Sequence, residues 1–169
     1  FYDPERSFNP PMNVLKVWEG GLSSHGATVG LVIALILFAR RYKIHVAEVM
    51  DRFSFAATLS SATIRFANFI NSEIVGRKTD GTWGIRFPRY DHLPVAQTPL
   101  RHPSQLYEVA LGLIVLTVLL LIDRRYGEKR PRGILGAAFL CTYFSGRFIV
   151  ELFKEFQVPE MEMSSMFTM

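Results

Sequence analysis

Four apolar stretches, each close to the length needed to cross a bilayer, constrain this chain more than any other feature. They lie at about 21–39, 46–71, 104–123 and 133–153. An α-helix rises 1.5 Å per residue, so about 20 residues cross a hydrocarbon layer of ~30 Å. Hydrophobic residues make up only 49% of the 169 residues, a modest share for a membrane protein, because charged loops alternate with these stretches. We therefore expect an all-α polytopic membrane protein with four transmembrane helices.

The segment between the second and third stretches is the other large feature. Residues 72–103 are polar and rich in Gly, Pro and Arg, and such a length is unusual for a structureless loop. We expect them to carry function or lie on the membrane surface as a small headpiece, with short strands in GTWGIRFPRY. The chain as a whole, 1–169, is interpreted as a single membrane domain. Because it begins at Phe1 and ends in PEMEMSSMFTM, we interpret it as a fragment that lacks flanking helices at both ends.

The positions of basic residues predict an orientation. The short connections 40–43 and 124–132 are basic, so both should face the cytoplasm, and 72–103 should face outward. That outer loop is itself basic, which an anionic lipid partner would explain. The net charge of +4 comes largely from residues that flank apolar stretches, which argues against nucleic-acid binding. The lone Cys141 lies inside an apolar stretch without metal-ligand spacing, and we expect no metal and no cofactor.

Polar residues collect where the four stretches meet the predicted outer surface. Ionisable side chains inside spanning helices usually face a bundle interior or a wet cavity. Some share a helix face by their spacing, as Arg65 does with Asn68 and as Tyr143 does with Arg147 and Glu151. The set comprises His25, Arg65, Asn68, Asn71, Glu73, His102, Gln105, Glu108, Tyr143, Arg147 and Glu151.

Each of these residues also has a plain structural explanation. Arg147 and Glu151 can form an intrahelical ion pair, Arg65 can extend to the interface, and His25 can bond backbone at a helix start. Tyr107 and Tyr143 can be interfacial aromatics, Glu108 can lie in water, and His45 and His92 are expected to be solvated. Their coincidence at one membrane depth favours a single site. Two arginines suit a phosphate and a histidine suits proton transfer, so we expect an active site for a phospholipid.

Four sequence blocks resemble a known family. SSHG at 23–26, IRFANFINSEIVG at 64–76, RHPSQLYE at 101–108 and YFSGRFIVELFKE at 143–155 resemble bacterial prolipoprotein diacylglyceryl transferase. The second block looks like that family's signature, and it retains Arg65, Asn68, Asn71 and Glu73. Ile64, Ala67 and Ser72 stand where the signature usually has glycine, which leaves less room for close backbone approach.

The resemblance implies a reaction and a membrane location. It implies transfer of the diacylglyceryl group of phosphatidylglycerol to the lipobox cysteine of a prolipoprotein, with release of glycerol-1-phosphate, at the outer face of the bacterial inner membrane. The four stretches then resemble the third to sixth helices of a seven-helix bundle. The first helices would carry a further important tyrosine, so this fragment is expected to be inactive alone.

The resemblance also implies roles for the polar residues. His25, Arg65 and Arg147 would be catalytic, with His25 as base or proton relay and the arginines on the phosphate. The substrate-binding residues would be Asn68, Asn71, Glu73, Gly76, His102, Gln105, Glu108, Tyr143 and Glu151.

Two other classes of protein remain as alternatives. A transporter or channel subunit with an anion or phospholipid site should carry polar residues near the middle of its spans and show repeat symmetry. Here the polar residues gather at one end of the spans and no repeat is evident. A structural membrane module would use its arginines only to hold helices together.

Overall fold

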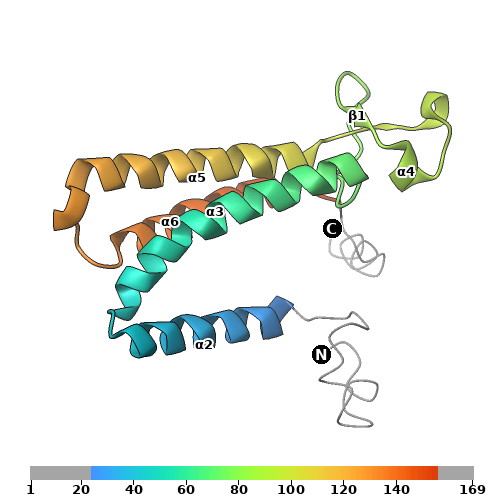
Figure 1. Cartoon of the computed structure of the whole chain (residues 1–169). Coiled ribbons are helices and arrows are strands. Elements are labelled where there is room, and N and C mark those ends of the chain that lie inside the picture. The colour runs from blue at the N-terminus through green and yellow to red at the C-terminus, as the bar shows by residue number, and fades with distance from the viewer. Residues whose placement is uncertain (1–23, 156–169) are drawn as a thin grey trace, which may run out of the picture. The chain divides into compact units, whose positions relative to one another are not determined.

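The computed structural model describes residues 24–155, and these residues are mainly helical (Figure 1). All four apolar stretches form helices: α2 is Ser24–Tyr42, α3 is Val46–Asn71, α5 is Ser104–Tyr126 and α6 is Ile134–Glu151. Two of them, α5 and α6, are long and apolar enough to cross a membrane by length and composition. The chain divides into two compact units, residues 1–49 and 50–169, which we describe separately.

The first unit contains α2 and the start of α3. Within it, α2 ends in Arg40 and Arg41, and the chain turns through Lys43, whose φ is +55°. The backbone N–H of Ile44 donates to Ala39 O at 2.9 Å and closes the end of the helix. His45 then starts α3 by accepting the N–H of Ala47 at its Nδ1, and it is exposed as predicted.

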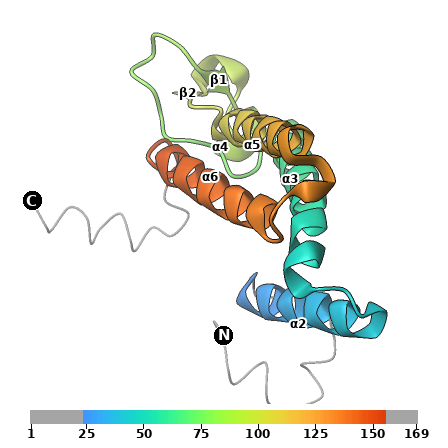
Figure 2. The same cartoon turned by 90° about the vertical axis from the view of Figure 1, so that its left-hand side faces the viewer.

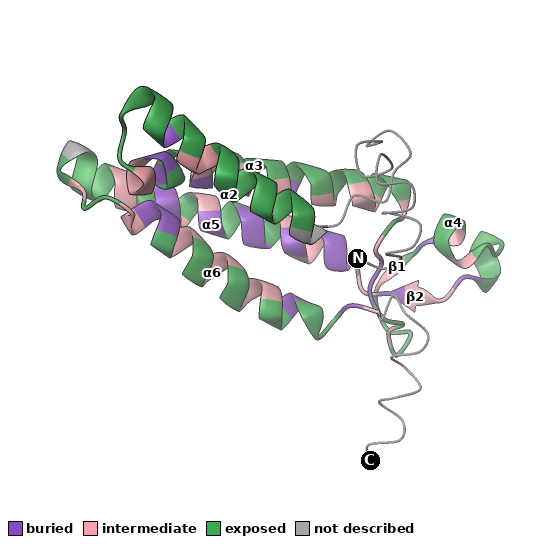
Figure 3. Ribbon diagram, turned by 90° about the horizontal axis from the view of Figure 1, so that it is seen from below, coloured by how far each residue is buried: buried purple, intermediate pink, exposed green. Residues whose placement is uncertain are grey.

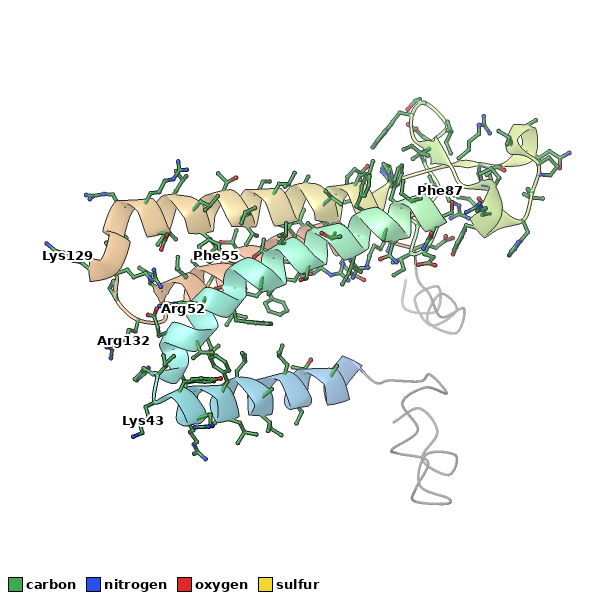
Figure 4. The ribbon with its side chains drawn as sticks, in the orientation of Figure 1. Lys43, Arg52, Phe55, Phe87, Lys129 and Arg132 are labelled. Carbon is green, nitrogen blue, oxygen red and sulfur yellow. The ribbon has the colours of Figure 1, made fainter. Side chains whose placement is uncertain are left out.

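In the second unit, α3 from Met50 onward, α5 and α6 pack side by side (Figures 1 and 2). One face of α5 is buried along its length, and that face is polar at its start and apolar beyond (Figure 3). Leu111, Val115, Leu119 and Leu135 form the core, with Phe55 among the side chains packed against it (Figure 4). The buried polar residues at the first turns of α5 need polar partners, because burying a polar group without a hydrogen bond is unfavourable.

The three helices approach each other closely at small residues. A Cβ on Gly112 of α5 would lie 2.9 Å from Ala62 Cβ of α3. A Cβ on Gly146 of α6 would lie 2.2 Å from a methyl of Leu111. Small residues at such crossings let helix backbones come together.

The start of α6 is capped by a carboxylate from α3. Its N-cap is Gly133, which has no side chain to serve as a cap. Instead the buried Asp51 accepts the backbone N–H groups of Gly133 and Gly136, both at 2.8 Å. Arg130 completes this end, with Nη1 2.7 Å from Asp123 Oδ1 and Nε 3.7 Å from Asp51 Oδ2. Nothing in the sequence pattern had singled out Asp51.

Residues 72–103 form an ordered headpiece, a point that the sequence had left open. It contains β1 (Ile85–Arg86), α4 (Pro88–Asp91), η3 (Val95–Gln97) and β2 (Leu100–Arg101), and β1 pairs antiparallel with β2. The predicted strand in GTWGIRFPRY is therefore confirmed, although it is only two residues long. The headpiece lies at the end of the helices where α3 stops and α5 begins (Figure 1).

Arg101 holds the headpiece together from its interior. Its guanidinium donates to both carboxylate oxygens of Asp91, at 3.1 and 2.6 Å, pairs with Glu155, and lies 5.0 Å from the ring centroid of Tyr90. Burial lowers the pKa of Arg101, but the hydrogen bonds to Asp91 and the charge of Glu155 outweigh burial, and the net pKa is raised. Burial also raises the pKa of Tyr90, and the nearby Glu155 raises it further.

Candidate functional site

Glu108, on the first turns of α5, is the centre of a cluster of charged side chains. It is 3% exposed, and three cations from three parts of the chain surround it. Arg65 Nε of α3 lies 2.5 Å from Oε2, Arg147 Nη1 of α6 lies 3.1 Å from Oε1, and Lys154 Nζ lies 3.0 Å from the same Oε1. A carboxylate so buried would be costly without such partners. The structure thus brings together Arg65, Glu108 and Arg147, three of the residues that we expected to share one site.

The two oxygens of Glu108 are used differently. Oε1 accepts an aligned hydrogen bond from Arg147. Oε2 has the short ionic contact with Arg65 but no well-directed hydrogen bond, because the N–H of Arg65 does not point along the contact. Arg65 and Glu108 form an ion pair, because the attraction between two charges in contact does not depend on the hydrogen-bond angle.

The stripe predicted on the fourth stretch exists on α6. Arg147 Nη1 also lies 2.7 Å from Glu151 Oε2, one turn further along the helix. Tyr143, one turn earlier, shares a 3.1 Å hydrogen bond between its hydroxyl and Ser61 Oγ of α3. It also stacks on Phe139 at 5.4 Å. The intrahelical pair that we considered as a structural explanation is thus present, but Arg147 uses the same Nη1 to reach Glu108.

The cluster carries an excess of positive charge. Three cations, Arg65, Arg147 and Lys154, face two carboxylates, Glu108 and Glu151, which leaves one positive charge when all are ionised. The arginine side chains remain 21% and 26% exposed. The Nη atoms of Arg65 and the Nε and Nη2 atoms of Arg147 take no part in these pairs. Donors of this kind bind phosphate oxygens in pairs.

A second polar group lies where α3 turns into the headpiece. Asn68 donates to Glu73 Oε2 at 2.7 Å, and Gln105 of α5 donates to the backbone oxygen of Glu73 at 2.6 Å. The structure therefore brings together three of the predicted binding residues, with Asn68 and Gln105 both bonded to Glu73. Buried side-chain oxygens of Asn68 and Gln105 have no donor among the described residues. Asn71 is exposed at the last position of α3.

The turn after α3 shows why the family signature usually has glycine where this chain has Ser72. The N–H of Glu73 donates to Asn68 O and the N–H of Ser72 donates to Phe69 O, which together form a Schellman motif. Ser72 holds the left-handed position of this motif, with φ +61°. Glycine adopts that conformation without strain, so the usual glycine here has a conformational reason. Ile64 and Ala67, the other two departures, are exposed in the described structure and cause no close contact there.

Gly76 is needed where the headpiece meets the end of α6. Its N–H donates to His102 O at 3.0 Å, and the next residue, Arg77, donates to Phe153 O at 3.0 Å. A Cβ on Gly76 would lie 2.4 Å from His102 O and 2.7 Å from Phe153 O, so no larger residue fits. The sequence placed Gly76 among the binding residues, and its closeness to backbone supplies a packing reason for it as well.

His102 lies in a group of aromatic rings rather than in the charged cluster. Its Nδ1 is 3.1 Å from the Tyr107 hydroxyl, and its ring meets Trp83 at 5.1 Å and Phe153 at 5.3 Å. Trp83 is half exposed. This group has the composition of an interfacial aromatic belt, the explanation considered above for Tyr107.

One residue of the charged cluster was missed by the sequence analysis, and one predicted residue lies outside the described side chains. Lys154 was not predicted, although it continues the α6 stripe at three residues beyond Glu151, and that spacing could have identified it. His25 falls on the first turn of α2, but its side chain lies outside the described part, so its role as a base stays a prediction. Within residues 24–155, no group of three or more His, Cys, Asp or Glu residues is arranged to hold a metal ion.

Comparison with known proteins gives the site its context. The chain matches the prolipoprotein diacylglyceryl transferase family over residues 1–169. It is 42% identical over 154 residues to the phosphatidylglycerol–prolipoprotein diacylglyceryl transferase of Tolumonas auensis, a match that covers 90% of this chain and 57% of that protein. It is 38% identical over 155 residues to the enzymes of that name in Chloroherpeton thalassium and Rickettsia typhi, covering 91% of this chain and 56% and 58% of those proteins.

The chain thus spans a little over half the length of these relatives. None of these relatives bears the name of a transporter or channel, so the comparisons give that alternative no support. The family match extends along the whole chain and agrees with the four blocks that carry the resemblance. This chain belongs to the prolipoprotein diacylglyceryl transferase family.

Proposed function

We propose that this chain supplies the phosphate-binding part of an enzyme that transfers the diacylglyceryl group of phosphatidylglycerol to the lipobox cysteine of prolipoproteins. The observation that carries the proposal is the pair of arginines held by the buried Glu108. It is supported by relatives that are named for this reaction. The enzyme would be a transferase without a cofactor, since displacement of a phosphate ester requires neither a redox cofactor nor a group-carrying cofactor.

In the proposed reaction, the cysteine thiolate attacks the glyceryl carbon that bears the phosphate ester. A C–S bond forms as the C–O bond breaks, and glycerol-1-phosphate leaves with the electron pair of that C–O bond. The thiol must first lose its proton, because the thiolate is the nucleophile. His25 is our candidate for accepting it or relaying it. The charge that develops on the leaving phosphate is what Arg65 and Arg147 would stabilise.

Glu108 has a positioning role in this scheme. It engages one nitrogen of each arginine and keeps the two guanidinium groups together against their mutual repulsion. Their remaining donors stay free for phosphate oxygens. Asn68, Glu73 and Gln105 form the neighbouring polar group, and we propose that they hold the lipid headgroup. Asn71, Gly76, His102, Tyr143 and Glu151 would complete the substrate-binding wall.

The proposed setting is the bacterial inner membrane. We propose that α2, α3, α5 and α6 all span it, as four of seven helices, and that the headpiece faces the periplasm. Figure 4 supports this orientation, because Arg52, Lys129 and Arg132 lie at the end of α5 and α6 remote from the headpiece, where cytoplasmic basic residues are expected. The prolipoprotein signal peptide and the bilayer would be the partners on the outer side.

The experiment uses the full-length enzyme in vesicles with phosphatidylglycerol and a lipobox peptide, and follows both lipidated peptide and glycerol phosphate. Arg147→Gln should lower kcat/KM by about 10²–10³-fold, the usual effect of removing one charge-stabilising donor. Arg147→Lys should remain impaired, because lysine cannot reproduce the fork of donors. Arg124→Gln is the matched control, since it removes an exposed arginine at the other end of the helices.

The result that would overturn the proposal is a folded Arg147→Gln protein with the activity of Arg124→Gln. Thermal unfolding of each variant distinguishes lost chemistry from lost fold. If His25→Gln retained near-normal rates, His25 would not be the base, while the arginine assignment would stand.

A further inference from the structure

We propose that Lys154 is a positioning residue for this reaction, which joins the headpiece to the arginine pair and gives the site its excess positive charge. The inference rests on the proposed function above. Neither the sequence pattern nor the resemblance had assigned Lys154 a role. It lies just beyond α6, and it is only 8% exposed. Lysine is rarely buried to this extent unless its ammonium group is paired.

The side chain of Lys154 is directed at the centre of the cluster. Its Nζ lies 3.0 Å from Glu108 Oε1, the oxygen that also accepts Arg147 at 3.1 Å, and 4.0 Å from Glu151 Oε2. Glu108 therefore has Lys154 as a third cationic partner, in addition to the two predicted arginines. The third partner shares the negative charge of Glu108 and weakens its hold on Arg147, which leaves that guanidinium more available to an anion.

The main chain of Lys154 holds the base of the headpiece. It forms an antiparallel bridge with Gly76, and its carbonyl oxygen accepts Arg77 Nε at 2.7 Å. The preceding carbonyl, of Phe153, accepts the N–H of Arg77 at 3.0 Å. One residue thus bonds to the headpiece through its backbone and to Glu108 through its side chain. The position of Glu108 and that of the headpiece are thereby linked.

The charge balance predicts what Lys154 contributes. Without it, Arg65 and Arg147 are balanced by Glu108 and Glu151, and the cluster is neutral. With it, the cluster has one positive charge for the single negative charge of a phosphodiester lipid. Loss of that charge should weaken binding of the anionic lipid more than it slows the chemical step, since the arginines that meet the leaving group remain.

The test compares three variants of the full-length enzyme: Lys154→Met, Lys154→Arg and Lys129→Met. Methionine has nearly the length of lysine and no charge, arginine restores the charge, and Lys129 is an exposed lysine at the remote end of α5. We measure kcat and KM for phosphatidylglycerol in vesicles of neutral lipid, with saturating lipobox peptide, and normalise to folded enzyme. Lys154→Met should raise KM about tenfold or more with less than threefold change in kcat. Lys154→Arg should return KM to within about threefold of the wild type, and Lys129→Met should leave it unchanged.

Three results would overturn the inference. They are a normal KM in Lys154→Met, a KM in Lys154→Arg as high as in Lys154→Met, and a loss that disappears after normalising to folded enzyme. The wild-type enzyme, assayed in parallel, separates this inference from the proposed function. If it releases no glycerol phosphate from phosphatidylglycerol, the proposed function fails. If it does and Lys154→Met matches it in KM, only the role of Lys154 fails.

Discussion

Removing the carboxylate of Asp51 should markedly lower the unfolding temperature of the protein without altering the charged cluster around Glu108. Asp51 is fully buried and accepts two backbone N–H groups at the start of α6, both at 2.8 Å. In Asp51→Ala, both donors lose their partner, and each unsatisfied buried group costs about 1–3 kcal/mol. Loss of a negative charge at a helix N-terminus adds about 0.3–1 kcal/mol. The hydrogen bond from Gly133 is only part-buried, so we expect a total near the lower bound, about 2–4 kcal/mol.

Two further variants separate the cap from the ion pair. Asp51→Asn keeps one acceptor oxygen and should cost about half as much as Asp51→Ala, about 1–2 kcal/mol. Asp123 also pairs with Arg130, but its side chain is 41% exposed and caps no helix. Exposed pairs are worth little, so Asp123→Ala should cost less than about 1 kcal/mol.

The assay is thermal unfolding of the full-length protein in detergent, followed by circular dichroism. At about 2–4 °C in Tm for each 1 kcal/mol, the value for proteins of about 150–250 residues, Asp51→Ala should lower Tm by about 4–16 °C. Below its transition, the variant should keep lipid transfer, because Asp51 and Glu108 lie near opposite ends of the helices. Equal and small shifts for Asp51→Ala and Asp123→Ala would show that the interhelical cap contributes no stability.

Two predictions concern the turns beside the site. Ser72→Gly should raise Tm by about 1–3 °C, because Ser72 has φ +61° and glycine removes the strain of that conformation; a lower Tm would contradict this. Gly76→Ala should cost about 1–3 kcal/mol and expose the headpiece to protease, because its Cβ would lie 2.4 Å from His102 O. Gly136→Ala is the control, since the nearest atom to its Cβ is at an ordinary 3.5 Å, and equal protease sensitivity of the two variants would argue against the close contact.

Much of the local structure follows from the sequence alone. An apolar stretch of about 20 residues satisfies its own backbone only as a helix, so all four helices were predictable with boundaries close to those observed. The spacing of Tyr143, Arg147 and Glu151 is sufficient to place them on one face, because helical geometry is local. The family resemblance then predicted which polar residues form the site. The same local logic would have included Lys154, three residues beyond Glu151.

Contacts between residues distant in the chain were decided only by the tertiary structure. Arg147 and Lys154 meet the same oxygen of Glu108, and Asp51 caps a helix that starts more than 80 residues later in the sequence. No periodicity encodes such pairs, since they depend on which helix faces pack together and at what depth. The polar residues at one end of the helices could thus be predicted from the sequence. Only the packed helices show that the buried carboxylate of Glu108 holds these residues together. They also show that Lys154 links Glu108 to the headpiece.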